Sequence, residues 1–212
     1  MPITDYLERN ARLHPNEISL VEVNPENQPD KNVSWHEYSL IESSAGDKYR
    51  RELTWKEFDV RANRFANFLF TRGVKKGDKV AILMMNCIDW LPIYFGILKS
   101  GAIAVPMNFR FSAEEIEYCS DLADVSVLVF GPEFTERLEK ILPSLKIRDY
   151  IFVGKDTPEF ADNYREMITY CSSCAPAMEI DDEDDGAIYF SSGTTGFPKA
   201  ILHRHKALVT SC

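Results

Sequence analysis

The sequence predicts an α/β fold in which helices cover a mostly parallel sheet. The first observation is that apolar strand-like segments alternate repeatedly with helix-like segments from residue 48 onward. The second is that the strand-like segments, such as residues 79–85, are continuously apolar rather than alternating. Strands of a parallel sheet are joined by crossover helices and are buried on both faces, so both observations indicate the same architecture.

Composition narrows the class of protein. The 212 residues are 45% hydrophobic and 27% charged, which is typical of a globular chain. Because 24 basic residues stand against 33 acidic ones, the net charge is −9, and a nucleic-acid partner held by a basic surface is not expected. No apolar segment is long enough for a membrane span. Five scattered cysteines, and an N-terminus without a signal-peptide pattern, predict a cytoplasmic protein.

The first part of the chain is expected to form a helix and a strand. Thr4 is predicted to cap the helix, which stops before Pro15. Residues 17–23 alternate between polar and apolar side chains and indicate a strand. Residues 24–49 are polar and irregular, and we interpret them as an insertion with a hairpin arm at residues 33–41.

Two capping boxes mark helix starts in the regular part of the chain. Their residues are Thr54 with Glu57 and Ser112 with Glu115. The other predicted helices are residues 89–99, 134–142 and 158–170. The predicted strands are residues 79–85, 102–105, 126–130, 149–153 and 187–190. We expect residues 1–185 to form an N-terminal α/β subdomain and residues 186–212 to begin the next β unit, with the acidic residues 179–185 as a solvated linker.

The most informative segment is the glycine- and hydroxyl-rich loop at residues 191–199. Its candidate phosphate-binding residues are Ser191, Ser192, Gly193, Thr194, Thr195, Gly196 and Lys199. The glycines let backbone N–H groups approach phosphate oxygens, the hydroxyls add donors, and the lysine supplies a compact positive charge. The loop differs from a Walker A motif, which has two more residues between its glycines and a Ser or Thr after its lysine. His203 and His205 are too few ligands for a metal, so no metal site is predicted.

At these residues the sequence resembles the adenylate-forming enzymes, which include acyl-CoA synthetases, aryl-CoA ligases, luciferases and peptide-synthetase adenylation domains. Their signature loop reads Tyr-Thr-Ser-Gly-Ser/Thr-Thr-Gly-x-Pro-Lys-Gly. Ser191 stands where Thr is common, and Ala200 replaces the closing Gly. The likeness extends through residues 53–73, 77–82 and 96–108 and covers nearly the whole chain except residues 24–49.

The resemblance implies an ATP-dependent acyl-CoA synthetase of fatty acid metabolism. In that reaction a carboxylate attacks the α-phosphorus of ATP to give an acyl-adenylate and pyrophosphate, and the thiol of coenzyme A then displaces AMP. The implied substrate is a fatty or aryl carboxylic acid, and the loop would hold the β- and γ-phosphates together with Mg²⁺. His205 falls where many acyl- and aryl-CoA ligases have a His near the carboxyl-binding pocket. The alternative is a histidine at a helix start that is satisfied by the backbone.

The resemblance also implies that the ribose-binding Asp and the catalytic Lys of the family belong to segments beyond this loop. We therefore expect the chain to be an N-terminal portion that is inactive alone and associates with itself through an exposed truncation surface. Two alternatives stay open. One is an adenylation domain of the peptide-synthetase type, which passes its acyl group to a carrier protein. The other is a non-catalytic nucleotide-binding or interaction module.

Overall fold

The computed structural model describes residues 1–23, 50–191 and 198–210, and it confirms the predicted α/β class. Its main sheet has seven strands in the order β7-β6-β5-β3-β4-β8-β9. Neighbouring strands run parallel except for the antiparallel pair β8 and β9. The strands are β3 (Lys79–Leu83), β4 (Ile103–Pro106), β5 (Val125–Phe130), β6 (Asp149–Phe152), β7 (Asp162–Asn163), β8 (Asp185–Ser191) and β9 (Lys199–Arg204).

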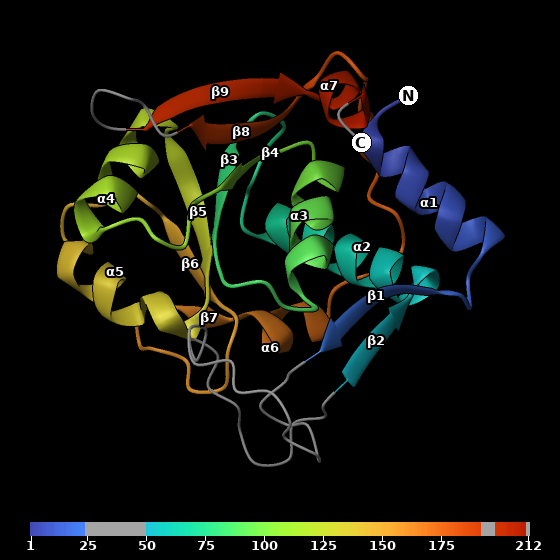
Figure 1. The fold of residues 1–212 in the computed structure, drawn as a ribbon. Coiled ribbons are helices and arrows are strands. Elements are labelled where there is room, and N and C mark those ends of the chain that lie inside the picture. Colours follow the sequence, from blue (N-terminus) through green and yellow to red (C-terminus); the bar gives the residue numbers. More distant parts are fainter. Residues whose placement is uncertain (24–49, 192–197, 211–212) are drawn as a thin grey trace, which may run out of the picture.

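Helices cover both faces of this sheet (Figure 1). One face carries α2 (Trp55–Thr71), α3 (Trp90–Lys99) and α6 (Tyr164–Thr169), and the other carries α4 (Ala113–Leu122) and α5 (Thr135–Ile141). The N-terminal helix α1 (Ile3–Leu13) contacts α7 (His205–Thr210). A separate antiparallel pair joins β1 (Ile18–Val23) to β2 (Arg50–Thr54). None of the helices in the described residues is long and apolar enough to cross a membrane.

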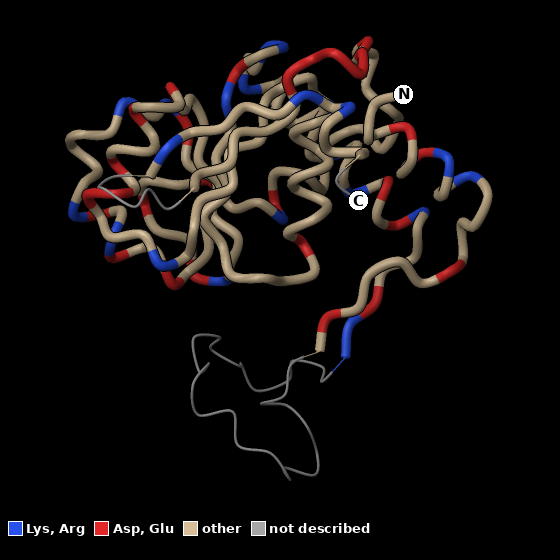
Figure 2. Tube along the Cα trace, turned by 45° about the horizontal axis from the view of Figure 1, so that its top comes forward, with Lys and Arg blue, Asp and Glu red and all other residues tan. Residues whose placement is uncertain are grey.

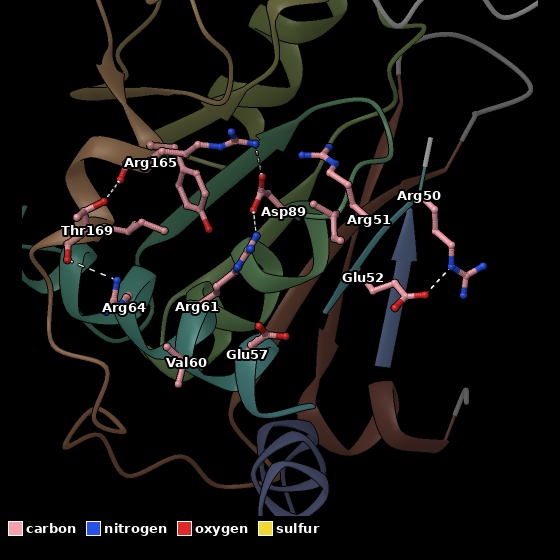
Figure 3. Close-up of a pocket in the computed structure, with 13 residues that line it drawn as sticks. Arg50, Arg51, Glu52, Glu57, Val60, Arg61, Arg64, Asp89, Arg165 and Thr169 are labelled. Carbon is pink, nitrogen blue, oxygen red and sulfur yellow. Dashed lines mark hydrogen bonds and ion pairs between the residues drawn. The ribbon is translucent and has the colours of Figure 1, made fainter. Parts of the chain in front are cut away.

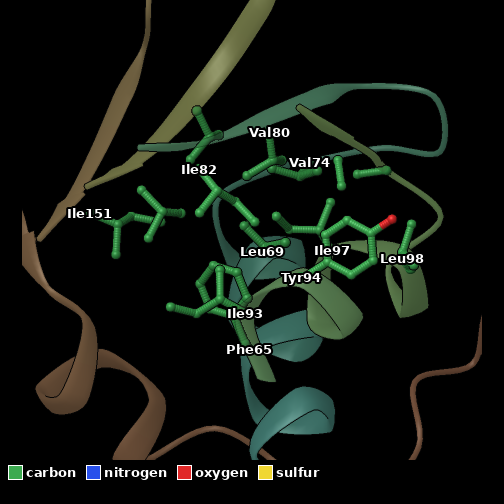
Figure 4. Close-up of a cluster of buried hydrophobic side chains, with 14 of the residues drawn as sticks. Phe65, Leu69, Val74, Val80, Ile82, Ile93, Tyr94, Ile97, Leu98 and Ile151 are labelled. Atoms are coloured by element: carbon green, nitrogen blue, oxygen red, sulfur yellow. The ribbon is translucent and has the colours of Figure 1, made fainter. Parts of the chain in front are cut away.

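The core has one apolar layer on each face of the sheet. In the layer shown in Figure 4, Phe65 of α2 and Ile93 and Ile97 of α3 are fully buried against strand residues such as Val80 and Ile82. Burying each such side chain contributes about 1.5–3 kcal/mol relative to leaving it exposed. The continuously apolar strands follow from this arrangement, because each strand residue meets a helix layer on one face or the other.

Two local predictions of helix starts are confirmed. Thr54 accepts a hydrogen bond from the backbone of Glu57 at 3.2 Å, and the Glu57 carboxylate accepts one from the Thr54 backbone at 2.8 Å. Ser112 and Glu115 make the same reciprocal pair. Each box satisfies two N–H groups that a helix start otherwise leaves unpaired.

Two other predictions of helix starts are wrong. The first helix begins at Ile3 after Pro2, and the buried Thr4 lies inside it instead of capping it. Pro2, the residue before the helix, has the φ of about −65° that its ring fixes, and it makes no side-chain cap hydrogen bond. The helix predicted over residues 158–170 is only α6, which follows β7 and is capped by Asn163 through hydrogen bonds from Arg165 and Glu166. The hairpin arm predicted at residues 33–41 lies outside the described residues.

Acidic and basic residues are interspersed over the described part of the chain (Figure 2). The acidic segment before β8 is partly exposed, as a solvated linker would be, but it is also held by ion pairs. Asp182 accepts from the amino group of Met1 at 2.9 Å, and Asp184 contacts Lys76 at 2.5 Å. Glu183 pairs with Arg204 and with Lys206. The segment therefore connects the N-terminus, the sheet and the last helix.

Candidate functional site

The predicted phosphate loop joins β8 to β9. Ser191 is the last residue of β8 and lies opposite Lys199, the first residue of β9. Directly opposed residues of an antiparallel pair have their side chains on the same face, with Cβ atoms about 5 Å apart. Both residues are exposed. A hydroxyl and an ammonium group can therefore reach one ligand from the two ends of the loop.

The remaining predicted loop residues lie outside the described residues; they are Ser192, Gly193, Thr194, Thr195 and Gly196. Their phosphate-binding role stays a prediction. The position of the loop is nevertheless set by its flanking strands. Because β8 runs parallel to β4, with Ala187 beside Ala104, the loop leaves the sheet at the carboxyl ends of the parallel strands. In open α/β sheets this edge is where ligands bind.

Aromatic side chains anchor β8 on both faces of the sheet. The Tyr189 hydroxyl is 2.8 Å from the hydroxyl of Tyr94 on α3, and the Tyr189 ring meets the His203 ring edge to face at 5.3 Å. On the other side, the rings of Phe190 and Phe111 pack at 6.1 Å. A strand that is held on both faces keeps the ends of the loop in place, which favours ordered ligand contacts. No sequence pattern links Tyr94 to Tyr189, because the two positions are far apart in the chain.

His205 lies at the other end of β9. Lys199 and His205 are separated by an extended strand, which spans roughly 20 Å at the usual rise per residue. The histidine is 1% exposed and begins α7, where its backbone N–H donates to the Asp184 carbonyl at 3.0 Å. Its Nδ1 atom is buried without a hydrogen-bond partner among the described residues. Burial lowers the pKa of His205, and the nearby Asp184 opposes this shift.

A glycine allows His205 to approach the sheet closely. A Cβ atom on Gly186 would lie 3.0 Å from a methyl carbon of Leu208 and 3.3 Å from the His205 ring. Both residues belong to α7, so the glycine lets this helix pack directly on β8. The structure thus places His205 after one end of β9 and Lys199 at the other end, and these two residues are not in contact. The place of His205 beside a carboxyl-binding pocket stays a prediction.

The described residues contain no cluster of His, Cys, Asp and Glu that could hold a metal ion. Ser191 and Lys199 offer a hydroxyl and a cation, which suit phosphate oxygens better than a metal ion. If Mg²⁺ binds here, it would be held mainly through phosphate oxygens and water.

Comparison with known proteins gives the family. Residues 8–212 match the model of the family described as AMP-binding enzyme, so the chain belongs to the AMP-binding enzyme family. It is 34% identical over 170 residues to a medium/long-chain-fatty-acid–CoA/3-oxocholest-4-en-26-oate–CoA ligase of Mycolicibacterium smegmatis, covering 77% of this chain and 30% of the relative. It is 32% identical over 162 residues to the long-chain-fatty-acid–CoA ligase FadD13 of Mycobacterium tuberculosis, covering 74% of this chain and 30% of that one. The chain thus spans about 30% of the length of these relatives.

Solved structures agree with this assignment. The anthranilate CoA ligase AuaEII, in complex with anthranoyl-AMP, is similar with a TM-score of 0.81 and 28% identity, over 97% of this chain and 35% of that one. The inhibitor-bound N-terminal domain of FACL13 from Mycobacterium tuberculosis is similar with a TM-score of 0.75 and 26% identity, over 96% of this chain and 44% of that one. The fold is that of the N-terminal part of an adenylate-forming enzyme.

Proposed function

We propose that this chain supplies the polyphosphate-binding part of an AMP-forming acyl-CoA synthetase. The observation that carries the proposal is the pairing of Ser191 with Lys199 at the carboxyl edge of the sheet, on either side of the signature loop. Membership in the AMP-binding enzyme family supports it. The proposed substrates are ATP, coenzyme A and a carboxylic acid.

In this proposal the chain positions and neutralises charge, and it forms no covalent bond with the substrate. ATP supplies the electrophilic phosphorus that the carboxylate attacks, and coenzyme A supplies the thiol that later displaces AMP. Lys199 and the Ser191 hydroxyl would donate to the β- and γ-phosphates, which carry the developing charge of the pyrophosphate leaving group. Mg²⁺, bound through the same phosphates, would share that role. His205 would line the carboxylate side, where burial keeps it neutral at pH 7.

The named activities of the relatives support a fatty acid as the substrate, and the anthranilate ligase makes an aryl acid the second candidate. We also propose a cytoplasmic location, since the thiols of Cys87, Cys119, Cys171 and Cys174 are free. Self-association of the chain is also proposed, because exposed apolar side chains such as Ile201 and Leu202 of β9 promote association.

The test is ATP binding and pyrophosphate exchange with a Lys199→Ala variant. Removing one charge-assisted contact should weaken MgATP binding to the 212-residue chain about tenfold in calorimetry. In the complete enzyme it should slow acid-dependent exchange of pyrophosphate into ATP about 10²-fold. The matched control is Lys140→Ala, which removes an exposed lysine of α5, an element outside the hairpin.

Equal ATP affinity and exchange rate in Lys199→Ala and the wild type would refute the proposal. The acid panel runs from short fatty acids to long ones and includes anthranilate and several amino acids. Exchange that depends on an amino acid alone would favour the peptide-synthetase type instead. Binding of ATP without exchange in the complete protein would favour a non-catalytic nucleotide-binding module.

A further inference from the structure

A second site-like feature is a cavity of about 890 Å³ between β2, α2, α6 and the segment before α3 (Figure 3). None of its lining residues belongs to β8 or β9, so it is distinct from the phosphate hairpin. The charged residues that line it are five arginines and three acids: Arg50, Arg51, Arg61, Arg64, Arg165, Glu52, Glu57 and Asp89. In a chain of net charge −9, this cavity has a local excess of positive charge.

One buried carboxylate organises the inner part of the cavity. The Asp89 side chain is 4% exposed and accepts from Arg61 Nη1 at 2.7 Å and from Arg165 Nη2 at 3.4 Å (Figure 3). Arg61 comes from α2 and Arg165 from α6, so two helices direct guanidinium groups toward the same point. Each guanidinium has five N–H donors, and Asp89 balances only one of the two positive charges. The arrangement therefore retains both charge and donors for a second anion.

Two further polar groups of the cavity have no hydrogen-bond partner in the part of the chain that the structure describes. The Tyr164 side chain is 1% exposed, and its hydroxyl has no hydrogen-bond partner among the described residues. The same holds for the buried Nε–H group of Arg64. Buried polar groups are almost always satisfied, because an unmet hydrogen bond is unfavourable. Burial raises the pKa of Tyr164 well above its usual value, so its hydroxyl stays protonated and able to donate.

The geometry indicates what kind of anion fits. A planar carboxylate is matched by a single guanidinium fork, whereas the donors here belong to three separate side chains, Arg64 of α2 and Tyr164 and Arg165 of α6. A phosphate group accepts hydrogen bonds in several directions through its tetrahedral oxygens. The other lining residues are Thr169 and three apolar residues, Val60, Ile88 and Ile168. A ligand with a phosphate group and an apolar body would match both parts of the cavity.

We propose that this cavity binds an organic phosphate monoester, with Arg64, Arg165 and Tyr164 donating to the phosphate group and Val60, Ile88 and Ile168 contacting the apolar body. The outer arginines contribute less. Arg50 pairs with Glu52 at 2.5 Å, and Arg51 pairs with Glu22. The proposal is independent of the function proposed for the phosphate hairpin.

Phenyl phosphate is the probe, titrated calorimetrically into the 212-residue chain. It should bind more tightly than inorganic phosphate, because only the ester carries an apolar body. Benzoate tests whether a carboxylate serves equally well. Arg165→Gln and Tyr164→Phe should each weaken phenyl phosphate binding about tenfold.

Arg165 suits this test because its side chain is 62% exposed and its removal leaves Asp89 paired with Arg61. The matched control is Arg12→Gln, an exposed arginine of α1 outside the cavity, which should bind like the wild type.

Thermal melting separates binding from folding. Tyr164→Phe removes a hydroxyl that has no hydrogen-bond partner among residues 1–23, 50–191 and 198–210, so the variant should melt at the wild-type temperature or above it. Phenyl phosphate should raise the melting temperature of the wild type and raise that of Tyr164→Phe less. The proposal is overturned if phenyl phosphate does not bind, if Arg165→Gln and Tyr164→Phe bind it as the wild type does, or if benzoate binds as tightly. If Lys199→Ala loses phenyl phosphate binding while Arg165→Gln and Tyr164→Phe keep it, the ligand binds at the hairpin, and the cavity proposal is also overturned.

Discussion

Replacing Lys99 by Met should strongly destabilise the chain. Lys99 ends α3, and its side chain is only 2% exposed. Its ammonium group donates to Glu8 of α1 at 2.8 Å and to Asp59 and Asn63 of α2 at 2.7 Å each. One cation thus joins three helices. Methionine keeps the length and the apolar contacts of the side chain and removes only the charge and its donors.

The magnitude follows from the exposure of the groups left behind. Glu8 is 47% exposed and can be solvated again by water, whereas Asp59 is 19% exposed and Asn63 is buried. Removing one member of a buried ion pair costs about 3–5 kcal/mol, and the partial exposure of both acids favours the lower end, about 3 kcal/mol. In a chain of this size, that loss lowers the melting temperature by about 6–12 °C.

Urea unfolding and thermal melting measure this loss. The control Lys140→Met changes an exposed lysine of α5 and should stay within about 0.5 kcal/mol of the wild type. Adding Asp59→Asn to Lys99→Met should recover part of the loss, because it removes the carboxylate that the first change leaves unpaired. A free energy of unfolding for Lys99→Met within 1 kcal/mol of the wild type, at an unchanged denaturant slope, would refute the reasoning.

Three further outcomes are expected. Gly96→Ala should cost about 1–3 kcal/mol in urea unfolding, because the new Cβ would lie 2.9 Å from the Ala62 carbonyl oxygen; wild-type stability would contradict this. Replacing residues 24–49 by Asn-Gly should lower the melting temperature by no more than a few degrees, since Val23 pairs with Arg50 and the strand ends already meet; a large drop would mean that the segment packs on the fold. Because burial lowers the pKa of His205, the unfolded chain takes up this proton more readily than the folded one, and the free energy of unfolding should fall as the pH drops below about 6.5. His205→Gln should reduce that fall between pH 7.5 and 5.5; an equal pH dependence in the variant and the wild type would contradict this expectation.

The features that the sequence predicted well are those with local causes. Each capping box needs two residues three positions apart, and both boxes form as predicted. The same rule would have located α6, because Asn163 and Glu166 have the same spacing. Thr4 misled the prediction because a favourable cap residue lies two positions after Pro2, which precedes the helix and makes no side-chain cap hydrogen bond. The order of the strands could not be predicted, because it depends on contacts between segments far apart in the chain.

The two candidate ligand sites also differ in whether their residues are neighbours in the sequence or are brought together only by the fold. The phosphate hairpin is contiguous, so its glycines, hydroxyls and lysine form a readable pattern, and pairing of its flanking strands adds the position. The arginine cavity has no such pattern, since Arg64 and Arg165 are about a hundred residues apart and α6 reaches α2 only after the chain has crossed to the far strand of the sheet. Its evidence is physical instead. The Tyr164 hydroxyl is buried, has no hydrogen-bond partner within the described residues, and lies in a cavity with an excess of guanidinium groups, which is unfavourable without a ligand. Binding an anion would relieve both the unmet hydrogen bond and the excess charge, which is why Tyr164 is the residue whose replacement tests that cavity most directly.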